Sequence, residues 1–516
     1  MLVFKVLAEK DRKKKEEERR SAARKAAAER GKDKQGEEAK PPTPRKPAAK
    51  TKRSDRAMPT GVMGRAGRLA ASSVKGSMRL AMIAPKALLG SKTTEKLFED
   101  FHAKTAKELA ETLGRLKGAS MKVGQLASFI DAGILPPEMR DVYQEVFGSL
   151  REGAPPMKPK LIKQVFKNEF DADPLELFAH FDETPIAAAS LGQVHYATLQ
   201  DGRSVAVKIQ YPGIEAAIKS DLAMTAAVKP LMPLLAPGLE ADEAIEEIRQ
   251  RVLEECDYTL EAENMDTLAD QYAGHPFVFV PRSISDRSSE RILTMERVDG
   301  IPFEKLKKLP KSERDRVGEI LFRFYYGSLH RHGFTSADPH PGNYKLMDDG
   351  RMAFFDFGLA FTLDPTMSPH FLGTLLALRD GDVDAFFEHG VKMRFVTRPK
   401  ETDPQRFFDW VAMSLDPIRH DREYTFTREF IAARTEPMMD PRSEWWPFIR
   451  RLNLPRWALL MYRLELGLFA VLAQLGATGN WHRITMEFYG VNDPSTELGR
   501  AEWEWLGEKS EASGTG

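Results

Sequence analysis

The 516-residue chain has a single cysteine, Cys256, and no formal net charge, because 76 Lys and Arg residues balance 76 Asp and Glu residues. One cysteine excludes an internal disulfide and suits a reducing compartment. No window reaches the roughly 18 uninterrupted apolar residues of a membrane-spanning helix, and the apolar start of the chain is too short for a signal peptide. We therefore expect a cytoplasmic protein with no spanning helix.

The longest nearly apolar stretch, residues 457–477, contains Arg463 and Glu465. Two charged side chains inside such a run favour a helix buried in a globular core over a membrane anchor. The chain also lacks internal repeats and any Cys/His spacing typical of a metal site.

Charge is spread unevenly along the chain. Residues 1–56 hold 20 Lys or Arg and 10 Asp or Glu residues, so they carry about +10 and the remainder about −10. Prolines interrupt the basic part of this stretch, which predicts a disordered tail over residues 1–60. The tail either solubilises the protein or makes a peripheral contact with an anionic membrane, although its interleaved acidic residues weaken the second interpretation. We expect no nucleic-acid partner, and the oligomeric state stays open.

Two kinds of pattern divide the rest of the chain. Apolar residues recur every three or four positions over 61–180, which predicts a helical extension. Residues 181–300 predict a small β-rich lobe with a hairpin at Asp201-Gly202 and one long helix at about 241–270. Residues 301–500 predict a larger helical lobe, and 501–516 a C-terminal tail. The expected fold is therefore α+β and bilobal, with a cleft between the lobes.

The most informative segment is TSADPHPGNYKLMDDGRMAFFDFG, residues 335–358. Asp338 would accept the proton of an attacking hydroxyl, while Asn343 and Asp356 would bind Mg²⁺. Each of them alone could be a turn or cap residue. Their spacing, with Phe357-Gly358 after Asp356, is typical of phosphoryl transfer from ATP.

Such chemistry needs a lysine that reaches the nucleotide phosphates. Lys208 ends the strand-like run Val205-Ala206-Val207-Lys208. Strand alternation places Ala206 and Lys208 on one face and the two valines on the other. An exposed lysine ends many strands, but this one follows a hairpin and precedes the segment with Asp338, which favours a role at the cleft.

The lysine also needs a carboxylate to orient it. On one continuous helix, Asp257 and Glu261 share a face, Glu254 lies close to them, and Glu255 points elsewhere. A solvated acidic face is the alternative interpretation. We favour Glu261 as the partner of Lys208.

The expected phosphate-covering loop is unusual. Protein kinases use glycines there so that backbone N–H groups can approach phosphates. This chain has Ala187-Ala188-Ala189-Ser190-Leu191-Gly192 instead. The segment is either a plain alanine-rich turn or a loop that holds the nucleotide differently.

Taken together, these motifs resemble the UbiB/AarF/ADCK family of atypical kinases over about residues 95–370. The family's Lys-x-Gly-Gln motif corresponds to Lys122 through Gln125, its alanine-rich loop to 187–190, and its Glu-x-Asp motif to Glu255 and Asp257. Ser336 departs from the pattern, since the family often has histidine there.

The resemblance implies a protein-kinase-like fold whose helical extension, bearing Lys122 and Gln125, covers the cleft and blocks protein substrates. It also implies pairing of Lys122 with Glu255 or Asp257. ATP and Mg²⁺ are the implied cofactors, and support of isoprenoid-quinone or other lipid metabolism is the implied role, with a lipid or phenolic small molecule as substrate. The residues assigned to nucleotide binding are Ala187, Ala188, Ala189, Ser190, Lys208, Met295 and Glu296.

Other functions remain as alternatives. A small-molecule phosphotransferase of the aminoglycoside or choline kinase type shares the Asp–x₄–Asn loop, but the Lys122 motif and the alanine loop argue against it. A true protein kinase lacks support, because the glycines and an Ala-Pro-Glu signature are missing. A nucleotide-binding scaffold is disfavoured by the retention of Lys208, Asp338, Asn343 and Asp356.

Overall fold

The computed structural model describes residues 156–189, 191–215, 240–439 and 443–514. The predicted tail over 1–60, most of the predicted extension over 61–180, and Ser190 lie outside the described residues. Lys122 and Gln125 lie outside them too.

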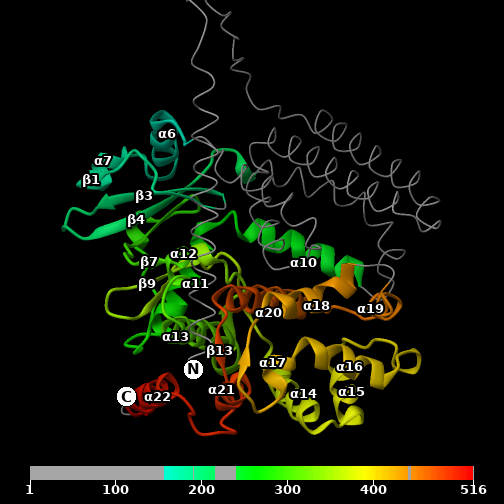
Figure 1. Cartoon of the computed structure of the whole chain (residues 1–516). Coiled ribbons are helices and arrows are strands. Elements are labelled where there is room, and N and C mark those ends of the chain that lie inside the picture. The colour runs from blue at the N-terminus through cyan, green and yellow to red at the C-terminus, as the bar shows by residue number, and fades with distance from the viewer. Residues whose placement is uncertain (1–155, 190, 216–239, 440–442, 515–516) are drawn as a thin grey trace, which may run out of the picture. The chain divides into compact units, whose positions relative to one another are not determined.

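A five-stranded antiparallel sheet forms the small lobe (Figure 1). The strands run in the order β1-β3-β4-β6. Strand β2 pairs with the first three residues of β3, on the edge where β1 pairs with the last two. Their bounds are β1 His180–Phe181, β2 Ala187–Ala189, β3 Gly192–Thr198, β4 Ser204–Gln210 and β6 Ile292–Glu296. The predicted hairpin is confirmed, because Gly202 turns the chain between β3 and β4 with a φ of 88° that favours glycine.

Two helices that precede the sheet belong to the same lobe. Helices α6 (Pro159–Phe170) and α7 (Pro174–Leu177) come before β1. Phe166 of α6 is fully buried in a core cluster with Val207 of β4. The core of the small lobe therefore begins before residue 181, the predicted start of this lobe, because the apolar face of α6 covers one face of the sheet.

The predicted single helix over 241–270 is wrong. The structure has two helices, α10 (Ala241–Glu254) and α11 (Tyr258–Gln271). Asp257 adopts an extended conformation between them, and its side chain accepts a hydrogen bond from Thr259 N at 2.8 Å. An N-cap of this kind starts a new helix, so side chains before and after residue 257 do not follow one helical wheel.

Helices dominate the larger lobe. Short strands and the connections between them contain residues 335–358, the segment with Asp338, Asn343 and Asp356. A four-stranded sheet has the order β5-β10-β9-β7, and β8 pairs with β11. The strands are β5 Val278–Phe279, β7 Ile301–Pro302, β8 Phe334–Ser336, β9 Tyr344–Leu346, β10 Met352–Phe354 and β11 Ala360–Thr362. Short 3₁₀ turns interrupt the chain at η3 Ser285–Arg287, η5 Pro341–Asn343, η6 Pro365–Met367 and η7 Pro399–Glu401.

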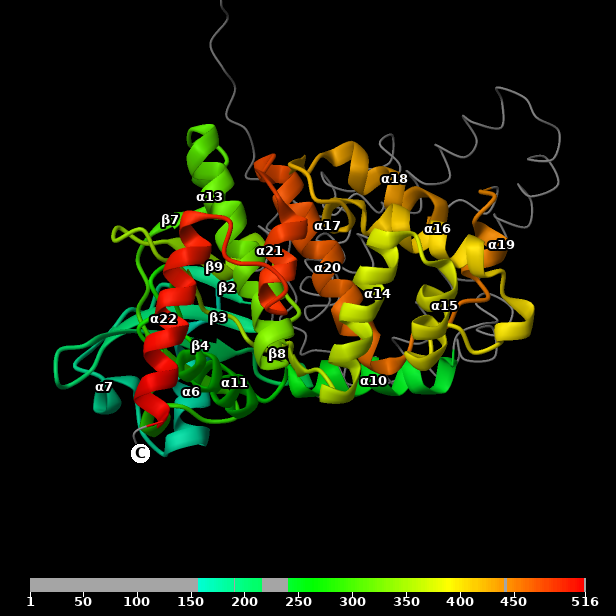
Figure 2. The same cartoon turned by 90° about the horizontal axis from the view of Figure 1, so that it is seen from below.

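Figures 1 and 2 show the helices of this lobe from two directions. They are α12 Phe303–Leu306, α13 Lys311–Phe322, the π-helix η4 Arg323–His332, α14 Ser368–Asp380, α15 Val383–Lys392, α16 Pro404–Ser414, α17 Asp416–Arg419, α18 Arg428–Met439, α19 Trp446–Ile449, α20 Arg456–Leu475, α21 Trp481–Phe488 and α22 Glu497–Gly514. A final strand pair joins β12 (Tyr424–Thr425) to β13 (Thr478–Gly479). The small lobe is built around a sheet and the larger lobe is mostly helical. The predicted bilobal α+β fold is therefore confirmed.

Helix α20 is the one helix, within the described part of the chain, that is long and apolar enough to cross a membrane. In the structure 67% of its most apolar window is buried. Leu464, Leu468 and Leu472 have no exposed surface and belong to the main core. This agrees with the prediction of a buried core helix.

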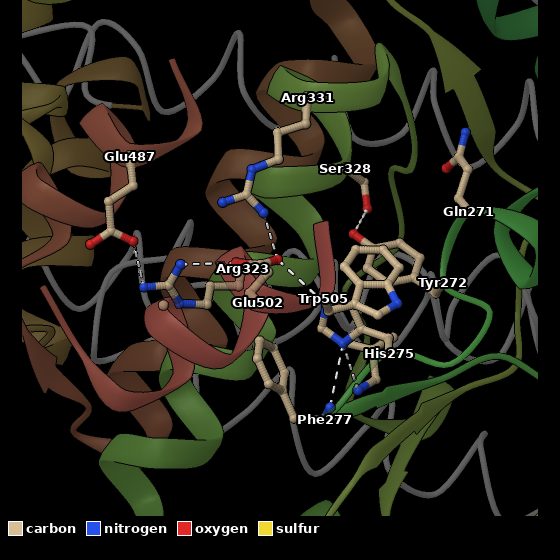
Figure 3. Close-up of polar contacts among 12 residues, drawn as sticks. Gln271, Tyr272, His275, Phe277, Arg323, Ser328, Arg331, Glu487, Glu502 and Trp505 are labelled. Atoms are coloured by element: carbon tan, nitrogen blue, oxygen red, sulfur yellow. Dashed lines mark hydrogen bonds and ion pairs between the residues drawn. The ribbon is translucent and has the colours of Figure 1, made fainter. Parts of the chain in front are cut away.

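The predicted C-terminal tail, 501–516, differs from the structure. Helix α22 extends to Gly514, and its Glu502 and Trp505 are buried. Figure 3 shows Glu502 next to Arg323 and Arg331. Oxygens of Glu502 lie 3.0 Å from Arg323 Nη1 and 2.6 Å from Arg331 Nη1. Three residues apart, Glu502 and Trp505 lie on one helix face, and this face attaches α22 to the large lobe.

Candidate active site

Lys208 projects from the central strand β4 of the small lobe. Its neighbours across the sheet are Val194 and Leu293. As strand alternation predicts, Val205 and Val207 face the core of the small lobe. The ammonium of Lys208 lies on the opposite face, toward α11 and the larger lobe, with the residue only 6% exposed.

Lys208 is held by a carboxylate from each lobe. Its Nζ donates to the two oxygens of Glu261 in α11, at 2.7 and 2.8 Å. It also lies 3.4 Å from Asp356 Oδ2. The ion pair between Lys208 and Glu261 that we favoured from the sequence is thus present, although Glu261 occupies the first turn of α11 and not the middle of a long helix.

Burial and charge act against each other in this cluster. Burial alone would lower the pKa of Lys208, but Asp356 and Glu261 raise that pKa well above its ordinary value, so the amine stays charged. For Glu261, burial is the largest influence and raises the pKa of its carboxyl, Lys208 opposes this, and Asp356 raises it further. One ammonium is therefore shared by two carboxylates.

Asp338 is positioned by contacts at both oxygens. Asn343 Nδ2 donates to Oδ2 at 2.9 Å, and Arg463 Nη2 of α20 donates to Oδ1 at 2.9 Å. The Asp338 backbone N–H donates to Ser336 Oγ at 3.3 Å. Ser336, where the family often has histidine, therefore supports the loop that carries Asp338.

The Asp-Phe-Gly segment closes the site from the larger lobe. Phe357 is buried in the main core, and its carbonyl accepts a hydrogen bond from Asn264 Nδ2 of α11 at 3.1 Å. The Gly358 N–H donates to Asp356 Oδ1 at 3.4 Å. These contacts hold the carboxylate of Asp356 toward Lys208. The two residues are 148 positions apart in the sequence.

The residues at this site fit Mg²⁺ bound with a nucleotide phosphate. A small cavity of about 20 Å³ lies between the lobes, which is room for an ion or a water. Its lining residues are Leu191, Lys208, Glu255, Tyr258, Glu261, Asp338, Asp356, Gly358 and Leu359. The carboxylates of these residues outnumber Lys208 and the adjacent Arg463, so the excess negative charge and the oxygen ligands suit a hard divalent cation. The bulk of a nucleotide would lie outside this cavity.

Asn343 can contribute as a ligand because of how its amide is oriented. Nδ2 donates to the backbone oxygen of Asp338 at 3.1 Å as well as to its carboxylate. With the nitrogen committed to Asp338, the amide oxygen of Asn343 is the atom suited to a cation.

The alanine segment forms a strand and not a loop. Ala187, Ala188 and Ala189 make up β2, which pairs with the start of β3. At Gly192 an added Cβ would lie 1.9 Å from the carbonyl oxygen of Ile209. The close approach of β3 to β4 therefore requires glycine at 192, three residues after the last alanine.

Met295 and Glu296 end strand β6. Met295 pairs in register with Ala206 and is buried in the main core. The Glu296 carboxylate accepts a hydrogen bond from Arg282 N at 3.0 Å. Both residues lie beside β4, two positions or more from Lys208 along the strand.

Glu255 and Asp257 separate at the helix break. Glu255 is the C-cap of α10 and lines the small cavity with Lys208, whereas Asp257 caps α11. The helical wheel placed Glu255 away from the site and was wrong, because α10 ends at Glu254. The pairing of Glu255 with Lys122 that the family resemblance implies stays a prediction, because Lys122 lies outside the described residues.

Sequence reasoning did not assign Arg463 to the site. The available signal was a charged residue inside the apolar run 457–477, and we used it only to argue against a membrane span. A buried charge needs a partner, and Asp338 is that partner although it lies 125 positions away.

Two lobes with a lysine and two carboxylates between them, beside an Asp–Asn loop, define a protein of the protein-kinase-like class. Residues 149–390 match the family model described as the ABC1 atypical kinase-like domain. Over these matched residues the chain belongs to the UbiB/ADCK family of atypical kinases.

Similar proteins agree with this assignment. The chain is 30% identical over 320 residues to the rat protein named atypical kinase COQ8B, mitochondrial, and the match covers 62% of this chain and 60% of the rat protein. It is 26% identical over 398 residues to the yeast protein named atypical kinase COQ8, mitochondrial, which covers 74% of this chain and 75% of the yeast protein. A solved structure of Rv3197 from Mycobacterium tuberculosis with erythromycin has a TM-score of 0.55 and 29% identity, and covers 76% of this chain and 98% of that one.

Proposed function

We propose that this chain is an atypical kinase or ATPase that binds Mg-ATP between its lobes and supports isoprenoid-quinone or other lipid metabolism. The observation that carries the proposal is the contact of Lys208 with Glu261 and Asp356, beside the loop in which Asn343 holds Asp338. The role in quinone or lipid metabolism rests on the family and on relatives named as atypical COQ8 kinases.

Each residue has a separate task in this proposal. Bound Mg-ATP would supply the phosphoryl group, and its cation would supply positive charge that neutralises the phosphates. Lys208, oriented by Glu261, would contact phosphate oxygens, and Asp356 with the amide oxygen of Asn343 would hold the cation. Asp338, fixed by Arg463, would orient an acceptor hydroxyl or a water and take up its proton.

The test combines nucleotide binding with turnover. We expect Mg-ATP to raise the melting temperature of the purified chain, since a ligand at 100 times its Kd stabilises by about 2.7 kcal/mol. Asp356→Asn should abolish the Mg²⁺-dependent part of that shift, and Asp380→Asn, an exposed aspartate on α14, should leave it unchanged. An unchanged shift in Asp356→Asn would contradict the metal role.

Turnover separates an enzyme from a scaffold. Phosphate release is measured with and without anionic liposomes and phenolic lipid headgroups, with Asp338→Asn as the control. We expect loss of release in Asp338→Asn with nucleotide binding retained. Binding without any release under these conditions would favour the nucleotide-binding scaffold.

A further inference from the structure

The larger lobe contains a second cavity that the proposed function does not use. It measures about 260 Å³ and is lined by residues of η4 and of helices α14 to α20. Figure 2 shows α14 to α20 close to one another in the larger lobe. Most of its wall is apolar or aromatic, including Phe371, Phe395, Phe407, Trp410 and Met461. A dry apolar cavity of about 150 Å³ is known to admit benzene, so this one has room for a ring with a short chain.

One side chain in the wall has N–H groups without hydrogen-bond partners, although its guanidinium lies over the rings of Tyr462 and Phe469. Arg434 of α18 is 2% exposed and lines the cavity. Its Nη2 donates to Glu465 Oε1 of α20. Nε and Nη1 are buried, and within the described part of the chain neither has a hydrogen-bond partner. Leaving buried donors unpaired is costly and rare in native proteins, which indicates an acceptor that enters the cavity from elsewhere.

The charges around Arg434 define what this acceptor is. Glu465 already neutralises the guanidinium, so the pair has no net charge. His330 also lines the cavity, and burial lowers its pKa to about 4, so it adds no charge near neutral pH. A carboxylate here would be an uncompensated negative charge beside Glu465 in an apolar space. A neutral oxygen, as in a ketone, quinone, ester or phenol, accepts from Arg434 without that penalty.

Helix α20 connects this cavity to the candidate active site. Glu465 lies two residues after Arg463, which donates to Asp338. Gly467 packs so closely on the neighbouring loop that an added Cβ would lie 2.7 Å from Pro339 Cγ. A shift of α20 at the cavity would therefore displace the loop that carries Asp338, because closely packed elements transmit strain.

We propose that this cavity binds a lipophilic molecule bearing a neutral oxygen acceptor, which receives hydrogen bonds from Arg434, and that α20 couples its binding to the Asp338 loop. The binding site stands independently of the proposed function, whereas the coupling rests on it.

The test uses three probes with a similar ring and chain: hexanophenone, hexylbenzene and 6-phenylhexanoate. Their affinities for the full chain are measured by equilibrium dialysis without detergent. We expect hexanophenone to bind at least about tenfold more tightly than hexylbenzene, because it alone of these two accepts from a charged donor. The carboxylate should bind more weakly than the ketone. Equal affinity for ketone and hydrocarbon, or tighter binding of the carboxylate, would overturn the assignment.

Variants assign the preference to Arg434. Arg434→Met alone leaves Glu465 buried without its partner and endangers folding, so Arg434→Met is combined with Glu465→Gln. In the double variant we expect hexylbenzene to bind as before and the ketone preference to disappear. Ser414→Trp, which fills the cavity, should weaken both probes. Arg422→Met, an exposed arginine of the same lobe, is the matched control. A ketone preference that survives the double variant would refute the role of Arg434.

The coupling has its own readout. If α20 links the two sites, saturating hexanophenone changes the Kd of Mg-ATP, and saturating Mg-ATP changes the Kd of hexanophenone by the same factor. If the ketone binds with a preference that depends on Arg434 but neither ligand changes the Kd of the other, the coupling is refuted and the binding site is not. Failure of Mg-ATP to bind at all would instead count against the proposed function.

Discussion

Lys208 and Glu261 form a buried ion pair whose members depend on each other. Their side chains are 7% and 3% exposed, and Asp356 lies next to them. Lys208→Met would leave two carboxylates close together without a cation. Breaking a buried pair by removing one partner costs about 3 to 5 kcal/mol, whereas replacing both partners with neutral groups is often close to neutral.

We therefore expect Lys208→Met to lower the free energy of unfolding by about 3 kcal/mol. The double variant Lys208→Met/Glu261→Gln should recover most of that loss. Urea unfolding of the single and double variants measures the coupling. Losses that simply add would show that the two side chains act independently, contrary to the observed contact.

Buried charge helps to attach helix α22 to the large lobe, together with the buried ring of Trp505. Burial alone would raise the pKa of Glu502, but contact with His275 and the charges of Arg331 and Arg323 lower it to about 2 (Figure 3). The folded-state pKa thus lies below the ordinary value of 4.5. Stabilisation by this carboxylate is complete above about pH 5 and is lost as pH falls through 2.

We expect Glu502→Gln to reduce the free energy of unfolding by about 3 kcal/mol at pH 7, with a reduction about 1 kcal/mol smaller at pH 3.5. Urea unfolding at both pH values gives the two differences. Glu504→Gln, exposed on the same helix, should be nearly neutral at each pH. A Glu502→Gln effect that stays constant between pH 7 and 3.5 would contradict the depressed pKa.

At the scale of the whole molecule, strand β6 connects the cores of the two lobes, because Ile292 is buried in the core of the small lobe and its neighbours are buried in the main core. Strand β6 belongs to the sheet of the small lobe, yet Leu293 and Met295 are buried in the main cluster with Trp481 of the large lobe. All seven tryptophans lie at residue 410 or later, so tryptophan fluorescence reports on the large lobe.

Val207→Ala removes buried methyl groups from the core of the small lobe and should cost roughly 2 kcal/mol. Because the lobes are joined through β6, we expect the urea midpoint followed by tryptophan fluorescence to fall as well. Leu175→Ala, at a side chain 65% exposed, serves as the control. A fluorescence midpoint unaffected by Val207→Ala would show that the lobes unfold separately.

Local patterns in the sequence were sufficient for several features of this protein. A two-residue turn with Gly202 predicted the β3–β4 hairpin, strand alternation predicted the orientation of Lys208, and the spacing from Asp338 to Asp356 predicted the residues that meet at the cleft. These features depend on backbone preference and on periods of two to four residues, and neighbours along the chain carry that information.

Features set by distant contacts were not predictable in this way. The helix break at Asp257, the contact of Arg463 with Asp338, the burial of Glu502 and the unpaired donors of Arg434 beside the large cavity all arise from how separate elements pack. A charge is stable inside a protein only where a partner is brought to it, and which partner arrives depends on tertiary packing. Residue type and spacing therefore determine the chemistry that is available, and the folded arrangement determines which of these groups act together.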